Sequence, residues 1–200
     1  MKEIRFRCIT ISKTETIKGF IVNAVKEDGV VQFFTYKKKS NIDSMNLVDV
    51  VCFKKRNDFL IVKDMHIIDR FEKIRNSFEL LSFALFIMEI TFKTNSRMNI
   101  LFNALKILSN DKPKIALVWF LANFLIQNGI FNENGFSPQE KALINFIRKT
   151  SNISNLKIDD VSFYVLLSKL FKNAKEYIGD DFSNNVVWRF LKNESSITKG

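Results

Sequence analysis

Residues 19–36 read GFIVNAVKEDGVVQFFTY, and this segment has the pattern of a β-hairpin. Two runs rich in Val, Ile, Phe and Tyr flank the turn residues Asp28 and Gly29. An Asp-Gly pair favours a tight hairpin turn because both residues tolerate positive φ angles. The segment therefore predicts two antiparallel strands, at 19–25 and 30–36, joined by a short turn.

Strand-like runs continue on both sides of this hairpin. Before it, Arg5 and Arg7 alternate with apolar residues, which places both arginines on one face of a strand. After it, residues 47–53 and 59–65 form two more runs around a turn. Five short strands within about 65 residues predict a small closed barrel of the OB type, with an SH3-like barrel as the alternative.

The periodicity changes to that of helices near Arg70. Seven apolar residues then step by three or four, which predicts one long helix with a single apolar stripe. The stripe consists of Phe71, Ile74, Phe78, Leu81, Leu85, Met88 and Phe92. We therefore expect an α+β protein in which an N-terminal five-stranded OB-type barrel, residues 1–70, is packed on a C-terminal all-α helical bundle, residues 71–200.

Helix start and stop signals support an all-helical second half. Pro113 fits the first turn of a helix for which Asp111 is the expected cap, and Gly129 is the expected stop. Ser137 and Glu140 have the spacing of a capping box at the start of another helix, in which the Ser side chain and the Glu side chain each bind a backbone N–H.

The charge of the chain indicates a polyanionic partner. The 200 residues contain 31 Lys and Arg against 21 Asp and Glu, a formal net charge of +10. Clustered cations bind phosphates favourably because binding releases condensed counterions. Half of the excess, +5, falls within the first 70 residues, so the predicted barrel is the denser in positive charge. A membrane surface, or no partner, is the alternative that net charge leaves open.

Several classes of site are disfavoured by composition. Cys8, Cys52 and His66 are the only Cys and His residues, too few for a structural zinc site. The two cysteines are expected to be small core residues in a reducing compartment. The acidic pairs at 159–160 and 180–181 precede or begin predicted helices, where a carboxylate interacts favourably with the helix dipole. With no Walker-type loop either, we expect no enzyme, metal or cofactor.

The location expected from sequence is cytoplasmic. The N-terminal residues are charged and lack the apolar stretch of a secretion signal. The longest nearly uncharged stretch, residues 80–88, is about half as long as a membrane span.

Basic residues of the predicted barrel are the candidate DNA contacts. OB barrels commonly hold single strands on the face of strands 2 and 3, with cations on phosphates and aromatic side chains under bases. Phe33, Phe34 and Tyr36 lie on the third predicted strand, just before a lysine run. The alternative is that the basic turns are merely solvated and protect the sheet from aggregation. The candidates are Arg5, Arg7, Lys37, Lys38, Lys39, Lys54, Lys55 and Arg56.

The arrangement resembles the RecO family of bacterial recombination mediators. The similar segments are residues 6–16, 33–40, 48–53, 59–71, 78–89 and 119–130. Two departures are visible: Lys37, Lys38 and Lys39 replace a glycine-containing basic segment, and residues 132–135 stand where many members carry a four-cysteine zinc module. The chain is therefore similar to a short, zinc-free form.

The resemblance implies a function in DNA repair with no chemical step. Such a protein binds single- and double-stranded DNA, anneals complementary strands and recognises the acidic C-terminal tail of single-strand-binding protein. With RecR it helps RecA load onto coated single strands, in the cytoplasm and associated with the nucleoid. The helical cations that are candidates for the tail site are Lys141, Arg148, Lys169 and Lys172.

Two rival functions remain open from sequence. One is a general OB-fold binder of single-stranded DNA or RNA with a helical oligomerisation domain. The other is an enzyme that uses acidic residues and a metal.

Overall fold

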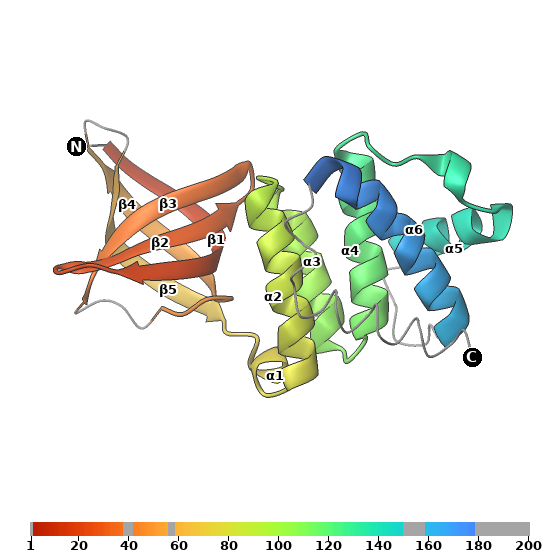
Figure 1. Cartoon of the computed structure of the whole chain (residues 1–200). Helices are drawn as coiled ribbons and strands as arrows, with labels where there is room; N and C mark the ends of the chain where they lie inside the picture. Colours follow the sequence, from red (N-terminus) through yellow and green to blue (C-terminus); the bar gives the residue numbers. More distant parts are fainter. Residues whose placement is uncertain (1, 38–41, 56–58, 150–158, 179–200) are drawn as a thin grey trace. The chain divides into compact units, whose positions relative to one another are not determined.

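The structure, a computed structural model, is of the α+β class, with an N-terminal β-sheet followed by helices (Figure 1). It describes residues 2–37, 42–55, 59–149 and 159–178. The strands found there are β1 (Lys2–Glu15), β2 (Gly19–Lys26), β3 (Gly29–Tyr36), β4 (Leu47–Lys54) and β5 (Leu60–Asp69). Each strand expected from the sequence is confirmed.

The strands close into a ring in the order β1-β2-β3-β5-β4. β1 is long enough to pair with two partners, β4 along its first half and β2 along its second half. A parallel pair between β3 and β5 completes the ring, and the other pairs are antiparallel. The turn between β2 and β3 ends at Gly29, whose φ of 131° is a conformation that L side chains rarely adopt.

Apolar side chains fill the inside of the ring. Alternate residues of a strand point to opposite faces, so each strand contributes every second side chain to this core. Both cysteines are among them and are free thiols. The buried members are Cys8, Val22, Ala24, Val31, Phe33, Ile42, Val48, Val50, Cys52 and Val62.

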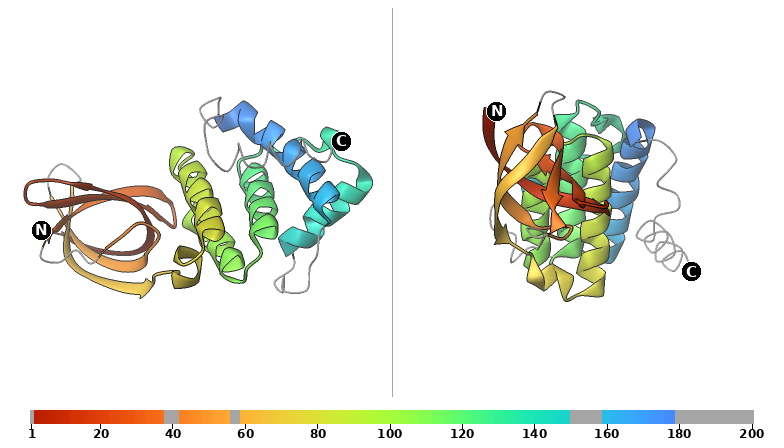
Figure 2. Two further views of the ribbon diagram at one scale, coloured as in Figure 1. Left: turned by 60° about the horizontal axis from the view of Figure 1, so that its bottom comes forward. Right: turned by 90° about the vertical axis from the view of Figure 1, so that its left-hand side faces the viewer.

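The helices follow the sheet in the chain. They are α1 (Glu72–Arg75), α2 (Phe78–Lys93), α3 (Met98–Ser109), α4 (Pro113–Gln127), α5 (Pro138–Lys149) and α6 (Asp160–Ile178), with a short 3-10 helix at Glu133–Gly135. The chain forms two compact units, residues 1–72 with 88–102, and residues 73–87 with 103–200. Within the second unit, α4 packs against both α5 and α6 (Figure 2).

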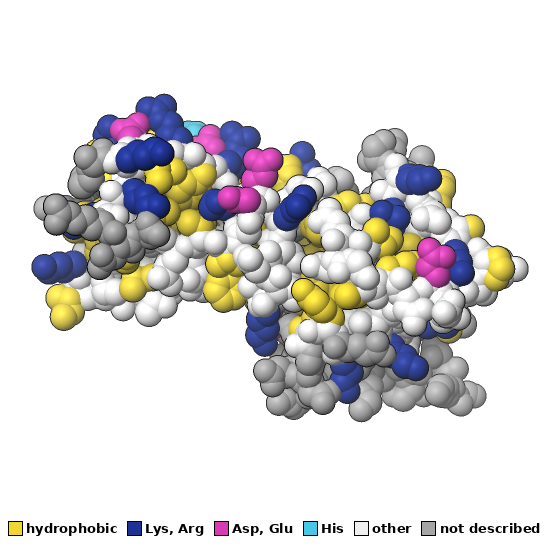
Figure 3. Space-filling view, turned by 90° about the horizontal axis from the view of Figure 1, so that it is seen from above, with side chains coloured by type: hydrophobic (Ala, Val, Ile, Leu, Met, Phe, Trp, Pro, Cys, Tyr) yellow, Lys and Arg dark blue, Asp and Glu magenta, His cyan; other side chains and the backbone are white. Residues whose placement is uncertain are grey.

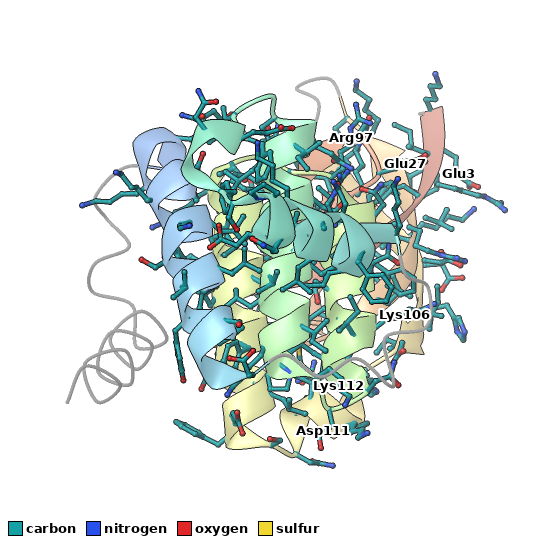
Figure 4. All side chains as sticks on the ribbon, turned by 90° about the vertical axis from the view of Figure 1, so that its right-hand side faces the viewer. Glu3, Glu27, Arg97, Lys106, Asp111 and Lys112 are labelled. Carbon is teal, nitrogen blue, oxygen red and sulfur yellow. The ribbon has the colours of Figure 1, made fainter. Side chains whose placement is uncertain are left out.

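Helix ends agree with the sequence signals at two places and differ at one. The capping box is confirmed: the Ser137 N–H donates to Glu140 at 2.6 Å, and the Glu140 N–H donates to Ser137 Oγ at 3.2 Å. α4 begins at Pro113 as expected and is followed by Gly129 with a φ of 68°. Asp111 is not its cap, because Asp111 adopts a φ of 60° within the preceding turn (Figure 4).

The single long helix expected after residue 70 is wrong. The chain breaks between α1 and α2, where the Ser77 hydroxyl accepts a hydrogen bond from the Leu80 N–H at 3.3 Å. Two residues of the expected stripe are exposed, Phe78 by 83% and Leu85 by 49%. α2 is apolar on most of its circumference, so a three-four spacing could not identify its buried face.

Candidate nucleic-acid interface

A row of apolar side chains crosses the outside of the ring. In the strand register, Ile21 of β2 lies opposite Phe34 of β3, Phe34 opposite Ile61 of β5, and Ile61 opposite Phe53 of β4. Each is partly exposed, whereas the residues next to them in the chain, Val22, Phe33, Val62 and Cys52, are in the core. We call these four residues the outer apolar row.

Two more aromatic rings extend the row. Tyr36 follows Phe34 by two residues and makes an edge contact with it, with ring centroids 5.1 Å apart. Phe59 precedes Ile61 by two residues, and its ring lies 6.3 Å from that of Phe34. Tyr36 is 47% exposed and Phe59 is 40% exposed. Phe34, Tyr36 and Phe59, which we call the aromatic cluster, are therefore all at least partly exposed to solvent.

Gly19 makes room for the central ring of this cluster. It lies opposite Tyr36 at the start of β2, on the same side of the sheet as Ile21. A Cβ atom at this position would be 2.7 Å from Phe34 Cζ and would also contact the Thr35 carbonyl oxygen. The absence of a side chain at Gly19 thus lets the Phe34 ring lie close against β2.

Beside this row, β1, β2 and β3 carry polar outward residues. Ser12, Asn23 and Gln32 lie on neighbouring strands and form a hydrogen-bonded ladder, with Asn23 Nδ2 donating to Ser12 Oγ at 3.0 Å and Gln32 Nε2 donating to Asn23 Oδ1 at 2.9 Å. Such polar residues are what the solvated face of an antiparallel sheet normally carries. The outer apolar row departs from that pattern.

The two arginines of β1 are paired with carboxylates on the sheet. Arg7 makes a bidentate contact with Asp49 of β4, at 2.8 and 3.0 Å, and Arg5 contacts Glu3 at 2.9 Å. Glu3 also contacts Lys63 at 2.7 Å. On this part of the sheet, positive charge is therefore largely balanced, and a phosphate would compete with Asp49 for Arg7.

The carboxylates in these pairs are held in their charged form. The hydrogen bond from Arg7 holds the pKa of Asp49 below its usual range. Hydrogen bonds from Lys63 and Arg5 do the same for the pKa of Glu3. The hydrogen bond from Lys37 lowers the pKa of Glu15. A charged partner that favours the ionised carboxylate explains each shift.

Basic residues flank the aromatic cluster. Lys37 directly follows Tyr36 and contacts Glu15 at 2.5 Å. Lys54 and Lys55 are exposed at the end of β4, where the Lys55 N–H donates to the Phe59 carbonyl at 3.0 Å. The Lys63 ammonium lies over the Phe53 ring, 5.3 Å from its centroid. On the face drawn in Figure 3, hydrophobic side chains are exposed among Lys and Arg side chains over the β-sheet.

Some predicted contacts lie outside the described residues, and one predicted aromatic has a different role. Lys38, Lys39 and Arg56 fall at positions that the structure does not describe. Phe33 is fully buried in the core, whereas its neighbours Phe34 and Gln32 face outward.

Sequence reasoning missed Phe59 and three members of the outer apolar row, Ile21, Phe53 and Ile61. The alternation within residues 59–65 held the signal for Phe59, because it puts Phe59 and Ile61 on the face opposite Val62.

The four helical cations are not equivalent. Lys141 and Arg148 line a hollow of about 350 Å³ whose other walls include Ile126, Phe131 and Ile144. Glu133 also lines it and lies 3.5 Å from the Lys141 ammonium. Arg148 Nε donates to Asn123 at 3.3 Å. Lys169 instead binds both carboxylate oxygens of Glu140 at 2.7 Å. Lys172 is exposed and does not line this hollow.

Both thiols are buried in the folded protein. Burial raises the pKa of Cys52 to about 12 and, together with the nearby Cys52, raises the pKa of Cys8 as well. Across the part of the chain that the structure describes, no three His, Cys, Asp or Glu residues are grouped so that they could hold a metal ion. In the same residues, no helix has the length and apolar character needed to cross a bilayer.

Comparison with known proteins returns no match, either to the models of known protein families or to curated protein sequences.

Proposed function

We propose that this protein is a recombination mediator of the RecO type, which binds single- and double-stranded DNA through its N-terminal sheet. The observation that carries the proposal is the aromatic cluster, which lies on a closed five-stranded sheet and is flanked by basic residues. The strand order β1-β2-β3-β5-β4, with its parallel β3–β5 pair, supports the OB fold that we expect from the sequence. OB folds bind oligonucleotides on the face of strands 2 and 3.

The proposed activity needs binding and no chemical step. Cations around the sheet neutralise phosphates and release counterions, which lowers the repulsion between two strands brought together. Complementary strands held in this way can anneal. In this role the protein acts in the cytoplasm, at the nucleoid, and works with RecR to help RecA load onto single strands coated by single-strand-binding protein.

The hollow in the helical unit fits the second part of this role. An acidic protein tail that ends in an aromatic residue would place carboxylates near Lys141 and Arg148 and its ring against Ile126, Phe131 or Ile144. Lys169 is a weaker candidate, because Glu140 contacts its ammonium at 2.7 Å, whereas the contact between Glu133 and Lys141 is longer, at 3.5 Å. We therefore propose Lys141 and Arg148 as the contacts for the tail of single-strand-binding protein.

Neutralising the lysine run after β3 tests the DNA-binding proposal. In the triple variant Lys37→Ala, Lys38→Ala, Lys39→Ala, we expect weaker binding of a labelled single strand in fluorescence anisotropy. The slope of log K against log salt should become flatter by about 0.7 for each phosphate that the variant no longer neutralises, or about 2 in total.

A matched control removes the same charge from the helices. The variant Lys106→Ala, Lys149→Ala, Lys175→Ala takes three exposed cations from α3, α5 and α6. Its salt slope should stay that of the wild type. Equal salt slopes for the wild type and the Lys37–Lys39 variant would show that these lysines do not contact DNA.

The exposed aromatic cluster also fits a second function, a general OB-fold binder of single-stranded DNA or RNA with a helical oligomerisation domain. The two functions differ when the DNA is already covered. A mediator continues to anneal strands coated with single-strand-binding protein, whereas a simple binder is excluded by the coat. A strand-annealing assay with and without the coat therefore separates them.

A further inference from the structure

We propose that the outer apolar row and the aromatic cluster form a base-stacking track that gives this protein a preference for unpaired DNA over duplex. The inference rests on the proposed DNA binding and names the part of the sheet that contacts the bases. Its central residues are Phe34, Tyr36 and Phe59, with Ile21 and Phe53 at the two ends.

The first argument is the position of the row on the sheet. The ring has a filled core of its own, so these side chains are not needed inside it. The adjacent outward rung of Ser12, Asn23 and Gln32 is polar and satisfied by its own hydrogen bonds. A contiguous exposed apolar surface beside such a rung marks an interaction site.

The second argument is the match between this surface and a nucleotide chain. The outer apolar row has one residue on each of four adjacent strands. Three strand spacings of about 4.8 Å give a track of about 14 Å. A strand whose bases face the protein rather than one another extends by more than about 3.4 Å per nucleotide, so the track takes at most about four nucleotides. About four nucleotides is the lower end of the site size of an OB fold, which is about 4 to 16 nucleotides.

The third argument is the charge around the track. Lys37 follows Tyr36 and is paired with Glu15, and Lys54 is exposed at the end of β4. The Lys63 ammonium lies over the Phe53 ring and also contacts Glu3 at 2.7 Å, so a phosphate would compete with these carboxylates for the lysines. An apolar protein partner gains nothing from cations in these positions, whereas a nucleotide chain carries a phosphate beside each base. The pattern of rings with cations alongside is that of a surface for single strands.

Preference for unpaired DNA follows from the geometry of the bases. In a duplex both faces of a base are covered by its stacked neighbours, so the aromatic cluster can contact only the faces of unpaired bases. Phosphate contacts are available in either form. Removing the rings should therefore weaken binding of single strands and leave duplex binding and the salt slope unchanged.

The test replaces the two most exposed rings by aliphatic side chains. The variant Tyr36→Leu, Phe59→Leu keeps an apolar surface and leaves Phe34 in place. Its affinity for a labelled single-stranded DNA of about 20 nucleotides should fall by on the order of tenfold or more, measured by fluorescence anisotropy. Affinity for the duplex of the same sequence should change by less than about twofold. The control Gln32→Ala changes an exposed residue on the adjacent polar rung and should bind like wild type.

The outcomes are distinguishable. The stacking track is overturned if the double variant loses the same affinity for single strand and duplex. It is also overturned if the variant loses no affinity while wild-type binding depends on salt. In both cases the proposed function is retained. Absence of any binding by wild type removes the proposed function itself. If the protein binds the RNA of the same sequence more tightly, the assignment to DNA is overturned. If the double variant changes its oligomeric state while its DNA binding is unchanged, the row is a contact between copies of the chain and the stacking track is overturned.

A crosslinking measurement supports the same test without a variant. A single strand that carries 5-bromodeoxyuridine is irradiated in complex with the wild-type protein, and the attached peptide is identified by mass spectrometry. Attachment at Tyr36, Phe34 or Phe59 is the expected result. Attachment confined to peptides of α3 to α6 would overturn the track.

Discussion

Replacing Gly19 by alanine tests whether the Phe34 ring lies where the structure places it. The new Cβ atom would be 2.7 Å from Phe34 Cζ and would also meet the Thr35 carbonyl oxygen. The ring can rotate away, but the carbonyl belongs to β3 and can move only with the strand. The substitution therefore both strains the β2–β3 pair and displaces the centre of the aromatic cluster.

The expected magnitude follows from overpacking. Adding a methyl group where no space exists typically costs about 1–3 kcal/mol. For a protein of this size, each kcal/mol shifts the melting temperature by about 2–4 °C. We therefore expect Gly19→Ala to melt about 2–12 °C below wild type in thermal denaturation followed by circular dichroism. Single-strand affinity should fall as well, because Phe34 no longer supports Tyr36 and Phe59.

Gly135 provides a matched control. A Cβ atom there would have no neighbour within 4 Å, and its φ lies outside the positive range. Gly135→Ala should therefore be neutral or stabilising by about 0.4–1 kcal/mol, since alanine restricts the unfolded chain. If Gly19→Ala melts at the same temperature as Gly135→Ala, the close approach of Phe34 and Thr35 to β2 is refuted.

Two further predictions concern the start of α5. Ser137→Ala removes the hydroxyl that accepts the Glu140 N–H and should lower stability by about 1 kcal/mol, measured by chemical denaturation; an unchanged midpoint would contradict the capping role. Burial raises the pKa of Glu140, but the hydrogen bonds from Lys169 and Ser137 outweigh it and hold that pKa below its usual range. A lowered pKa of Glu140 stabilises the fold at pH values above the usual glutamate pKa of about 4.3. This contribution is lost as the pH falls through the pKa that Glu140 has in the folded protein. Glu140→Gln should therefore melt below wild type at pH 7, with the difference shrinking below about pH 4; a constant difference would contradict the assignment.

The strands could be predicted from sequence because alternation and an Asp-Gly turn are local signals. Which face of each strand lies inside depends on how the ring closes, and this is why Phe33 and Phe34 could not be separated beforehand. The bidentate contact between Arg7 and Asp49 joins residues 42 positions apart. Its effect on the candidate arginines becomes visible only once β1 and β4 are in register.

The helical half shows the same limit. Proline and the capping box define the starts of α4 and α5 by local chemistry, so both were predictable. The exposed side of α2 could not be predicted, because a helix that is apolar around most of its circumference carries no periodic signal. The break before α2 depends on Ser77, whose hydroxyl competes with the helix for backbone hydrogen bonds.

The most direct test of the central claim is a salt titration of the wild-type protein with a single-stranded DNA and its duplex. Between about 50 and 200 mM salt, the account predicts a linear fall of log K with log salt for both forms, with tighter binding of the single strand. The slope for the single strand should be at least about 2 in magnitude, which corresponds to about three neutralised phosphates. No binding at about 50 mM salt, or an affinity independent of salt, would contradict the claim that this sheet is a nucleic-acid interface.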